Sequence, residues 1–494
     1  MPNRLFATKP INIILKEAAG GGEHELKRAL GPINLITLGI GAIIGAGIFV
    51  LTGTAAAQFA GPAIVISYII AGVGCVFAGL CYAEFASMLP IAGSAYTYGY
   101  ATMGELVAWI IGWALVLEYA FGAATVAVGW SGFASNLVSF FGVKLPFNPS
   151  PKVYLTLFGH PLTAQVDLFA MAALVVITIV LVVGVRESAN FNSAAVMIKV
   201  SIVLIFIGLA GTFAFGHWSH MTANWHPFIP HNLGHFGQFG WSGIMRGAGV
   251  VFFAYIGFDA VSTAAQEARN PQKDMPFGIL GSLVICTALY ILVSGLLTGV
   301  VSYTDLNVPA PVADAARDIG VGWAVVLIDL GAIAGLASVM LVMLLGQTRV
   351  LFTMSRDGLL WPWVGKLHPK FCTPYLITII VGIFAAALAA FFPITLLGEL
   401  VSLGTLLAFT IVSLGVWVMR VRHPEMHRPF RTPLVPVVPI CGMIVSVALM
   451  LSLDRPAWIG FSSWLVFGLF IYFGYSRKHS KVQRELSAKA VAGD

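Results

Sequence analysis

The sequence contains few charged residues. Asp, Glu, Lys and Arg make up 10% of its 494 residues, whereas soluble domains average roughly a quarter. Hydrophobic residues make up 58%, and the mean hydropathy is +0.90. A water-soluble fold of this composition would expose large apolar patches to solvent. The composition therefore argues against a soluble enzyme and predicts a membrane protein.

Patterns that carry catalysis or bind metals are also scarce. The five cysteines show no metal-ligand spacing, and the histidines between positions 217 and 235 match no standard metal motif. No serine-histidine-aspartate arrangement or phosphate-binding loop occurs in a suitable context. The net charge of +6 is spread over many short loops, which argues against a nucleic-acid partner. We therefore expect neither an enzyme nor a resident cofactor or metal.

Long apolar runs dominate the chain instead. A helix needs about 20 apolar residues to cross a bilayer, and twelve runs approach that length. They cover residues 33–57, 63–89, 105–136, 164–184, 191–215, 240–265, 277–301, 322–352, 374–392, 395–420, 434–453 and 457–475. The sequence thus predicts an all-α protein with twelve transmembrane helices, surrounded by lipid in the plasma or inner membrane.

The distribution of basic residues predicts the orientation. If the N-terminus is inside and the helices alternate, most of the 27 Lys and Arg residues fall in inside loops and termini. Both termini are then cytoplasmic. Residues 9–17 have the pattern of a short amphipathic helix on the cytoplasmic membrane surface.

Two of the predicted helices contain glycine-rich interruptions. The first has four glycines within residues 39–47, and the sixth has glycines on both sides of residues 250–256, followed by Asp259. Glycine weakens a helix by about 1 kcal/mol relative to alanine. Tight packing of Gly41 and Gly45 against another helix is the alternative reading, whereas a dinucleotide-binding loop is excluded because no strand precedes it.

Paired interruptions of this kind predict a substrate site near the middle of the membrane. In an inverted repeat of five plus five helices, the first and sixth helices correspond to each other. Non-helical backbone is tolerated at membrane depth only where it lines a cavity. Freed N–H groups can hold a carboxylate, and freed C=O groups can hold an ammonium. A zwitterionic α-amino acid satisfies both.

Three motifs together resemble the amino acid–polyamine–organocation superfamily, more narrowly the bacterial type of its cationic amino acid transporter branch. They are residues 41–47, 252–259 and 267–276. The resemblance implies the leucine-transporter fold, with broken helices 1 and 6. It divides the chain into an N-terminal segment (1–32), repeat one (33–215), repeat two (240–420), helices 11 and 12 (434–475) and a cytoplasmic tail (476–494).

The resemblance also implies residue roles. The substrate carboxylate would meet backbone N–H groups, and the α-amino group would meet backbone carbonyls. The implied donors are Gly45, Ala46 and Gly47, and the implied acceptors are Ile43, Phe253, Ala254 and Ile256. Tyr290 and Met343 match pocket-lining positions, and many relatives have Ser or Thr where this chain has Ala46. A bulky Met343 would favour small substrates.

Ionisable residues inside the predicted helices are candidates for coupling. Lys199 lies near the middle of the fifth helix. Burial penalises its charged form, and in relatives with a lysine here the amine takes the place of a sodium ion between helices 1 and 8. The alternative is that Lys199 extends to a membrane interface. Asp259 would exchange the proton or cap a half-helix, and Glu118 would contact a side chain or a polar network.

These features predict a proton-coupled symporter of L-amino acids that works by alternating access. Small neutral substrates such as alanine are favoured. The alternatives are a cationic amino acid transporter, an exchanger or, from another class, a membrane amino-acid receptor. The proton is the only coupling ion expected, and the sequence leaves a small single-span subunit open.

Overall fold

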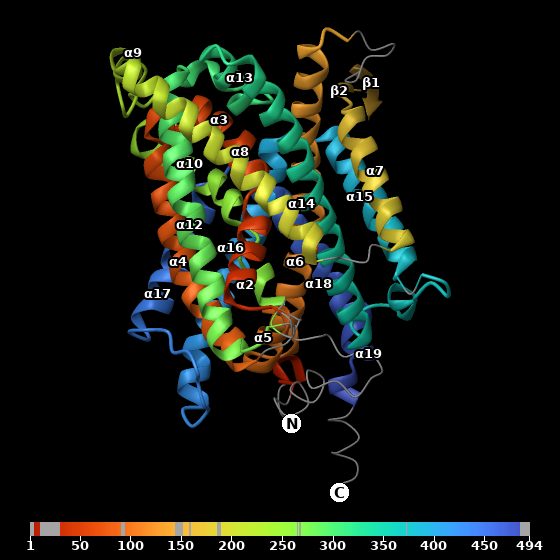
Figure 1. The fold of residues 1–494 in the computed structure, drawn as a ribbon. Coiled ribbons are helices and arrows are strands. Elements are labelled where there is room, and N and C mark those ends of the chain that lie inside the picture. The colour runs from red at the N-terminus through yellow and green to blue at the C-terminus, as the bar shows by residue number, and fades with distance from the viewer. Residues whose placement is uncertain are drawn as a thin grey trace, which may run out of the picture.

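The computed structural model describes residues 4–9, 30–89, 94–143, 152–157, 160–184, 189–263, 265, 268–371 and 373–484. Within them, long helices run roughly parallel to one another (Figure 1). The longer helices are α2 (Pro32–Ile43), α4 (Ile64–Met88), α6 (Glu105–Phe140), α7 (Leu168–Val183), α8 (Ala189–Gly216), α10 (Gly240–Val251), α12 (Pro271–Val300), α14 (Gly322–Arg356), α15 (Tyr375–Phe391), α16 (Ile394–Arg422), α17 (Val437–Leu451) and α18 (Arg455–Ile471).

Short elements join these helices. They are α3 (Thr52–Ala55), α5 (Ser94–Thr102), α9 (Trp218–Asn224), α11 (Ala260–Thr263), α13 (Pro311–Asp318) and α19 (Arg477–His479). An antiparallel pair of strands, β1 (Lys152–Leu157) and β2 (His160–Gln165), is the only sheet in the described ranges. This hairpin departs from the all-α prediction, and β2 includes Ala164, where the fourth apolar run was expected to begin.

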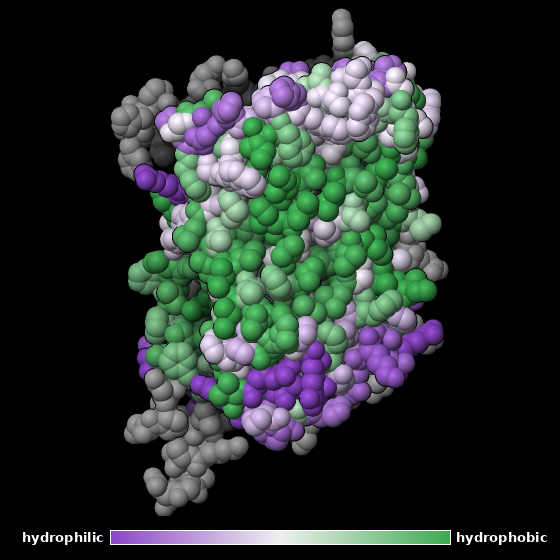
Figure 2. All heavy atoms as spheres, turned by 90° about the vertical axis from the view of Figure 1, so that its left-hand side faces the viewer, coloured by the Kyte–Doolittle hydropathy of each residue, from purple (hydrophilic) through white to green (hydrophobic). Residues whose placement is uncertain are grey.

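The described helices are apolar enough to make this a membrane protein. Seven helical stretches are long and apolar enough to cross a bilayer, and four further apolar helices are shorter. Fewer stretches than the twelve predicted runs reach full length, because interruptions shorten α2 and α10 and because α7, α15 and α17 have 17 residues or fewer. Figure 2 shows the result on one face, a broad apolar belt between two polar ends.

Two groups of helices pack around the centre. The long α6 packs against α14 and α16, and α12 packs against α2 and α4. Buried apolar side chains from these helices form one continuous cluster. Small residues allow the close packing in places, since a Cβ on Gly278 of α12 would lie 2.7 Å from the Leu35 Cβ of α2.

Both ends of the described chain meet at Glu105, at the start of α6. Its carboxylate accepts hydrogen bonds from the hydroxyls of Tyr100 (2.9 Å) and Tyr472 (3.1 Å), from the Gln483 amide (2.6 Å) and from the Ser480 hydroxyl. The Glu105 backbone N–H donates to the carbonyl of Ala7. Residues 4–9 and 472–484 therefore lie at the same end of the molecule. The predicted amphipathic helix at 9–17 falls outside the described residues, except for Lys9.

A neighbouring carboxylate strengthens this junction. Asp357, just after α14, accepts hydrogen bonds from Lys9 (3.2 Å) and from the Tyr96 hydroxyl (2.7 Å). Its backbone carbonyl accepts a bond from the Lys481 N–H. The junction thus joins the two chain ends to α5, α6 and α14.

We predict that Glu105→Ala destabilises the protein by about 3 kcal/mol or more. The variant leaves several buried donors without an acceptor, and each unsatisfied donor costs roughly 1–3 kcal/mol. The measurement is the apparent melting temperature in detergent. Ser463→Ala is the control, since the exposed Ser463 hydroxyl bonds only within its own helix. A Glu105→Ala variant that melts with the control would contradict this account of the junction.

Candidate functional site

The first interruption follows α2. Helical geometry ends at Ile43, and Ile44 is extended, with ψ of 104°. The chain then resumes in a π-helical turn, Gly47–Leu51, which leads into α3. The N–H groups in the first turn of a helix have no partner within that helix. The predicted donors Gly45, Ala46 and Gly47 lie at this start of the turn.

The second interruption follows α10. A short 3₁₀ turn, Phe252–Tyr255, comes after Val251, and Ile256 is extended, with ψ of 133°. Gly257 has φ of +119°, a left-handed conformation that strongly favours glycine. Both sequence-predicted interruptions are thus present in the backbone.

The two interrupted segments lie against each other. A Cβ added to Gly47 would sit 2.3 Å from the Ala254 Cα, and one added to Gly257 would sit 2.6 Å from the Ala42 carbonyl oxygen. Glycine at these two positions lets the backbones touch. The two interruptions are therefore in direct contact.

Tyr290 of α12 joins the two segments. Its hydroxyl lies 3.0 Å from the Ile43 carbonyl oxygen and 2.8 Å from the Ala254 carbonyl oxygen. A hydroxyl has one proton, so the two carbonyls share a single donor. These are two of the four carbonyls predicted to hold a substrate ammonium. Of the other two, the Phe253 carbonyl accepts the Ile256 N–H.

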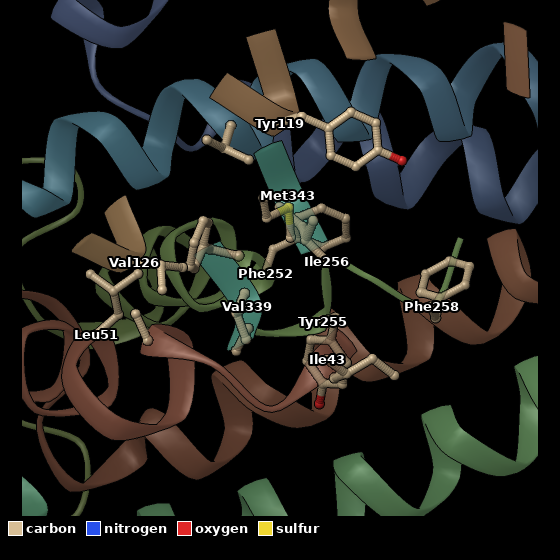
Figure 3. Packing of buried hydrophobic residues seen from close by; sticks show 14 of the residues in the cluster. Ile43, Leu51, Tyr119, Val126, Phe252, Tyr255, Ile256, Phe258, Val339 and Met343 are labelled. Atoms are coloured by element: carbon tan, nitrogen blue, oxygen red, sulfur yellow. The ribbon is translucent and has the colours of Figure 1, made fainter. Parts of the chain in front are cut away.

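Apolar side chains from five segments pack around the two interruptions. Figure 3 shows them from close by, and all belong to the buried apolar cluster. Met343 of α14 lies next to α6, since a Cβ on Gly122 would be 3.6 Å from its Sδ. Val339 lies one turn earlier on α14. A Cβ added to Gly45 would be 3.7 Å from the Val339 Cγ2. The labelled members are Ile43, Leu51, Tyr119, Val126, Phe252, Tyr255, Ile256, Phe258, Val339 and Met343.

Lys199 of α8 is buried beside the first interruption. Its side chain is 1% exposed, and its Nζ donates to the Gly41 carbonyl at 2.8 Å. A Cβ on Gly335 of α14 would lie 2.8 Å from the Lys199 Cγ, so a small residue there makes room for the stem. The amine therefore sits between α2 and α14 and does not extend to a membrane interface.

Asp259 and Glu118 are both buried. The Asp259 backbone carbonyl accepts hydrogen bonds from the N–H and hydroxyl of Ser262 at the start of α11. The Glu118 carboxylate lies near the Thr405 hydroxyl of α16. Among the described residues, Glu118 does not pair with a basic side chain.

The sequence did not reveal which groups the Tyr290 hydroxyl contacts. This residue was expected only to line the pocket, whereas its hydroxyl contacts both interrupted segments. A tyrosine within an apolar helix needs a partner for its hydroxyl, and this requirement was the available signal. The identity of the two carbonyls depends on tertiary packing and could not be read from spacing.

We predict opposite outcomes for two neighbouring glycines. Gly47→Ala places a methyl group against the Ala254 backbone and should abolish folding to a monodisperse protein. Gly45→Ala meets Val339 and the Ile43 carbonyl oxygen at ordinary contact distances and should keep the fold. Size-exclusion chromatography in detergent measures both. Equal behaviour of the two variants would show that the segments do not touch at Gly47.

Comparisons with known proteins agree with this geometry. A model of the family described as amino acid permease matches residues 30–475. A branched-chain amino acid permease of Bacillus subtilis is 44% identical over 98% of this chain and 100% of its own length. A methylthioribose transporter of the same organism is 43% identical over 97% and 99%.

A more distant relative is found in plants. The vacuolar cationic amino acid transporter 4 of Arabidopsis thaliana is 40% identical over 82% of this chain and 65% of its own length. The chain therefore belongs to the amino acid permease family within the amino acid–polyamine–organocation superfamily, and it is a multi-pass membrane transporter rather than an enzyme.

Proposed function

We propose that the chain transports an L-amino acid whose backbone is held between the two interruptions. The main support is that the Ile43 and Ala254 carbonyls converge on a single hydroxyl, that of Tyr290. An α-ammonium group has three N–H donors and can serve both carbonyls at once. The substrate carboxylate then lies at the free N–H groups of Gly45, Ala46 and Gly47, where the helix dipole is positive.

The proposed architecture has twelve crossings. The first ten form an inverted repeat of five plus five (33–215 and 240–420) with the leucine-transporter fold, followed by helices 11 and 12 (434–475). An even number of crossings agrees with the meeting of residues 4–9 and 472–484 at Glu105. We place this end of the molecule, with residues 1–32 and 476–494, in the cytoplasm, because most of the basic residues then lie inside.

The proposed coupling ion is the proton, and Lys199 carries it. The amine donates to the Gly41 carbonyl, just before the first interruption. Loss of the proton removes the charge from this contact and loosens the first helix relative to α14. A sodium ion in the same place would be repelled by the protonated amine. Asp259 is the second candidate for proton exchange because it is buried directly after the second interruption.

The proposed substrate is a small neutral amino acid such as alanine. The side-chain space is walled by apolar residues, including Met343 and Ile256 (Figure 3). The named relatives include branched-chain and cationic amino acid transporters. Membership of the family therefore does not determine which substrate side chain is accepted. A cationic substrate is the second candidate, favoured by the buried Glu118 carboxylate.

Uptake into proteoliposomes tests the proposal. Labelled alanine, leucine and arginine are offered without sodium, with and without an inward proton gradient. Gradient-stimulated alanine uptake is the expected result. Preferred arginine uptake would replace the substrate assignment, and uptake that needs internal amino acid but no gradient would make the protein an exchanger. Binding without uptake under every condition would make it a receptor.

Lys199→Ala should abolish the stimulation of uptake by the proton gradient, since no titratable group then contacts the first helix at Gly41. Alanine binding, measured as a thermal shift, should remain detectable. Lys199→Arg is the matched variant, because it keeps a permanent charge and should also lose the gradient response. Unchanged pH-driven uptake by Lys199→Ala would exclude this coupling role.

Met343→Ala should shift selectivity towards larger side chains. Removing the thioether enlarges the apolar pocket, and each additional buried methylene contributes about 1–3 kcal/mol to discrimination. We expect the leucine-to-alanine uptake ratio to rise about tenfold. Met354→Ala is the control, since Met354 packs near Gly112 and Tyr96 away from the interruptions. An equal rise in both variants would place Met343 outside the pocket.

A further inference from the structure

We propose that Arg246, held by Glu399 and Asp454, is a positioning residue that closes the outer side of the substrate site. The proposal rests on the proposed function, which places this end of the molecule outside and the interruptions at the substrate. It adds a role for three charged residues that lie away from the interruptions. No contact between them and the substrate is needed.

Arg246 is the meeting point of several elements. It lies on α10, and its Nη2 is 3.5 Å from a Glu399 carboxylate oxygen on α16. The same nitrogen forms an ion pair with Asp454, which immediately precedes α18. The guanidinium also stacks over the Phe59 ring at 4.1 Å. Phe59 continues the first interrupted helix, so Arg246 ties both interrupted helices to α16 and α18.

Burial makes this contact strong. The side chains of Arg246 and Glu399 are 12% and 4% exposed, whereas Asp454 is 46% exposed. Charges attract far more strongly in a dry environment than in water. Water that enters when the outer side opens will therefore weaken the Arg246–Glu399 pair and favour further opening. The pair therefore stabilises the closed state, and it makes the transition between the closed and open states all-or-none.

The connection to the site runs through α10. Arg246 lies six positions before Phe252, about 9 Å along a helix. The helix between them is continuous up to Val251. An outward movement of α10 at Arg246 is thus transmitted along the helix to Val251, where the second interruption begins. α16 shows no interruption between Ile394 and Arg422 and provides the fixed partner.

Glu399→Gln is the variant that tests the closure. It keeps the shape of the side chain and removes the charge. The outward-open state gains population, so the KM for external substrate and kcat should fall together, each by about fivefold, because substrate binds more readily and the return step is slower. A merely structural lesion would lower the yield of folded protein without lowering KM. Glu425→Gln is the matched control, since Glu425 is exposed near His423 at the opposite end.

The charge-swapped protein provides the rescue. In Arg246→Glu combined with Glu399→Arg the two charges still attract, and the new arginine can also pair with Asp454. We expect the KM and kcat of the double variant to return towards the parent values. In Arg246→Glu alone, the new carboxylate and that of Glu399 repel each other. Failure of the double variant to improve on both single variants would overturn the proposal.

Hydrogen exchange separates this proposal from the transport assignment. Amides of residues 240–251 should exchange faster in Glu399→Gln than in the parent, with residues 271–300 unchanged. This readout needs no transport, so it remains valid if the substrate or coupling ion is assigned wrongly. Unchanged exchange in 240–251, together with unchanged KM and kcat, would show that Arg246 does not close the site.

Discussion

The structure depends on one constraint, the need to satisfy backbone N–H and C=O groups where water is absent. An uninterrupted helix meets this need internally. At Ile44 and at Ile256 the chain gives up helical bonds inside a buried, apolar bundle. Unsatisfied groups at both points would be costly, so the two segments are placed together and share the Tyr290 hydroxyl. The proposed substrate site is thus the place where the backbone's own hydrogen-bonding requirement is met by a single shared hydroxyl.

Close approach of the two segments makes the sharing possible. Gly47 and Gly257 permit backbone contact with Ala254 and Ala42, which larger residues would prevent. Lys199 then holds the helix just before the first interruption from the side of α8. Glu399 of α16 holds the helix just before the second interruption through Arg246. Each interrupted helix therefore has its own charged anchor on a neighbouring continuous helix.

The sequence predicted the features that depend on local chemistry. Glycine spacing located both interruptions, and the isolated Lys199 marked a buried contact. Features that depend on tertiary pairing were not accessible. Arg246 carried no prediction, because nothing in its neighbours along the chain identifies Glu399 as its partner. The β1–β2 hairpin was missed because it lies between two apolar runs and gives a weak pattern of its own.

The Glu105 junction has a consequence for the biogenesis of the protein. Three of its four side-chain donors, from Tyr472, Ser480 and Gln483, follow all the long helices in the sequence. The buried carboxylate at the start of α6 can therefore form these three hydrogen bonds only after every membrane segment has been made and inserted. This end of the molecule can assemble completely only after synthesis has passed residue 483. A product that stops before residue 472 leaves the Glu105 carboxylate with the Tyr100 hydroxyl as its one side-chain donor among those described.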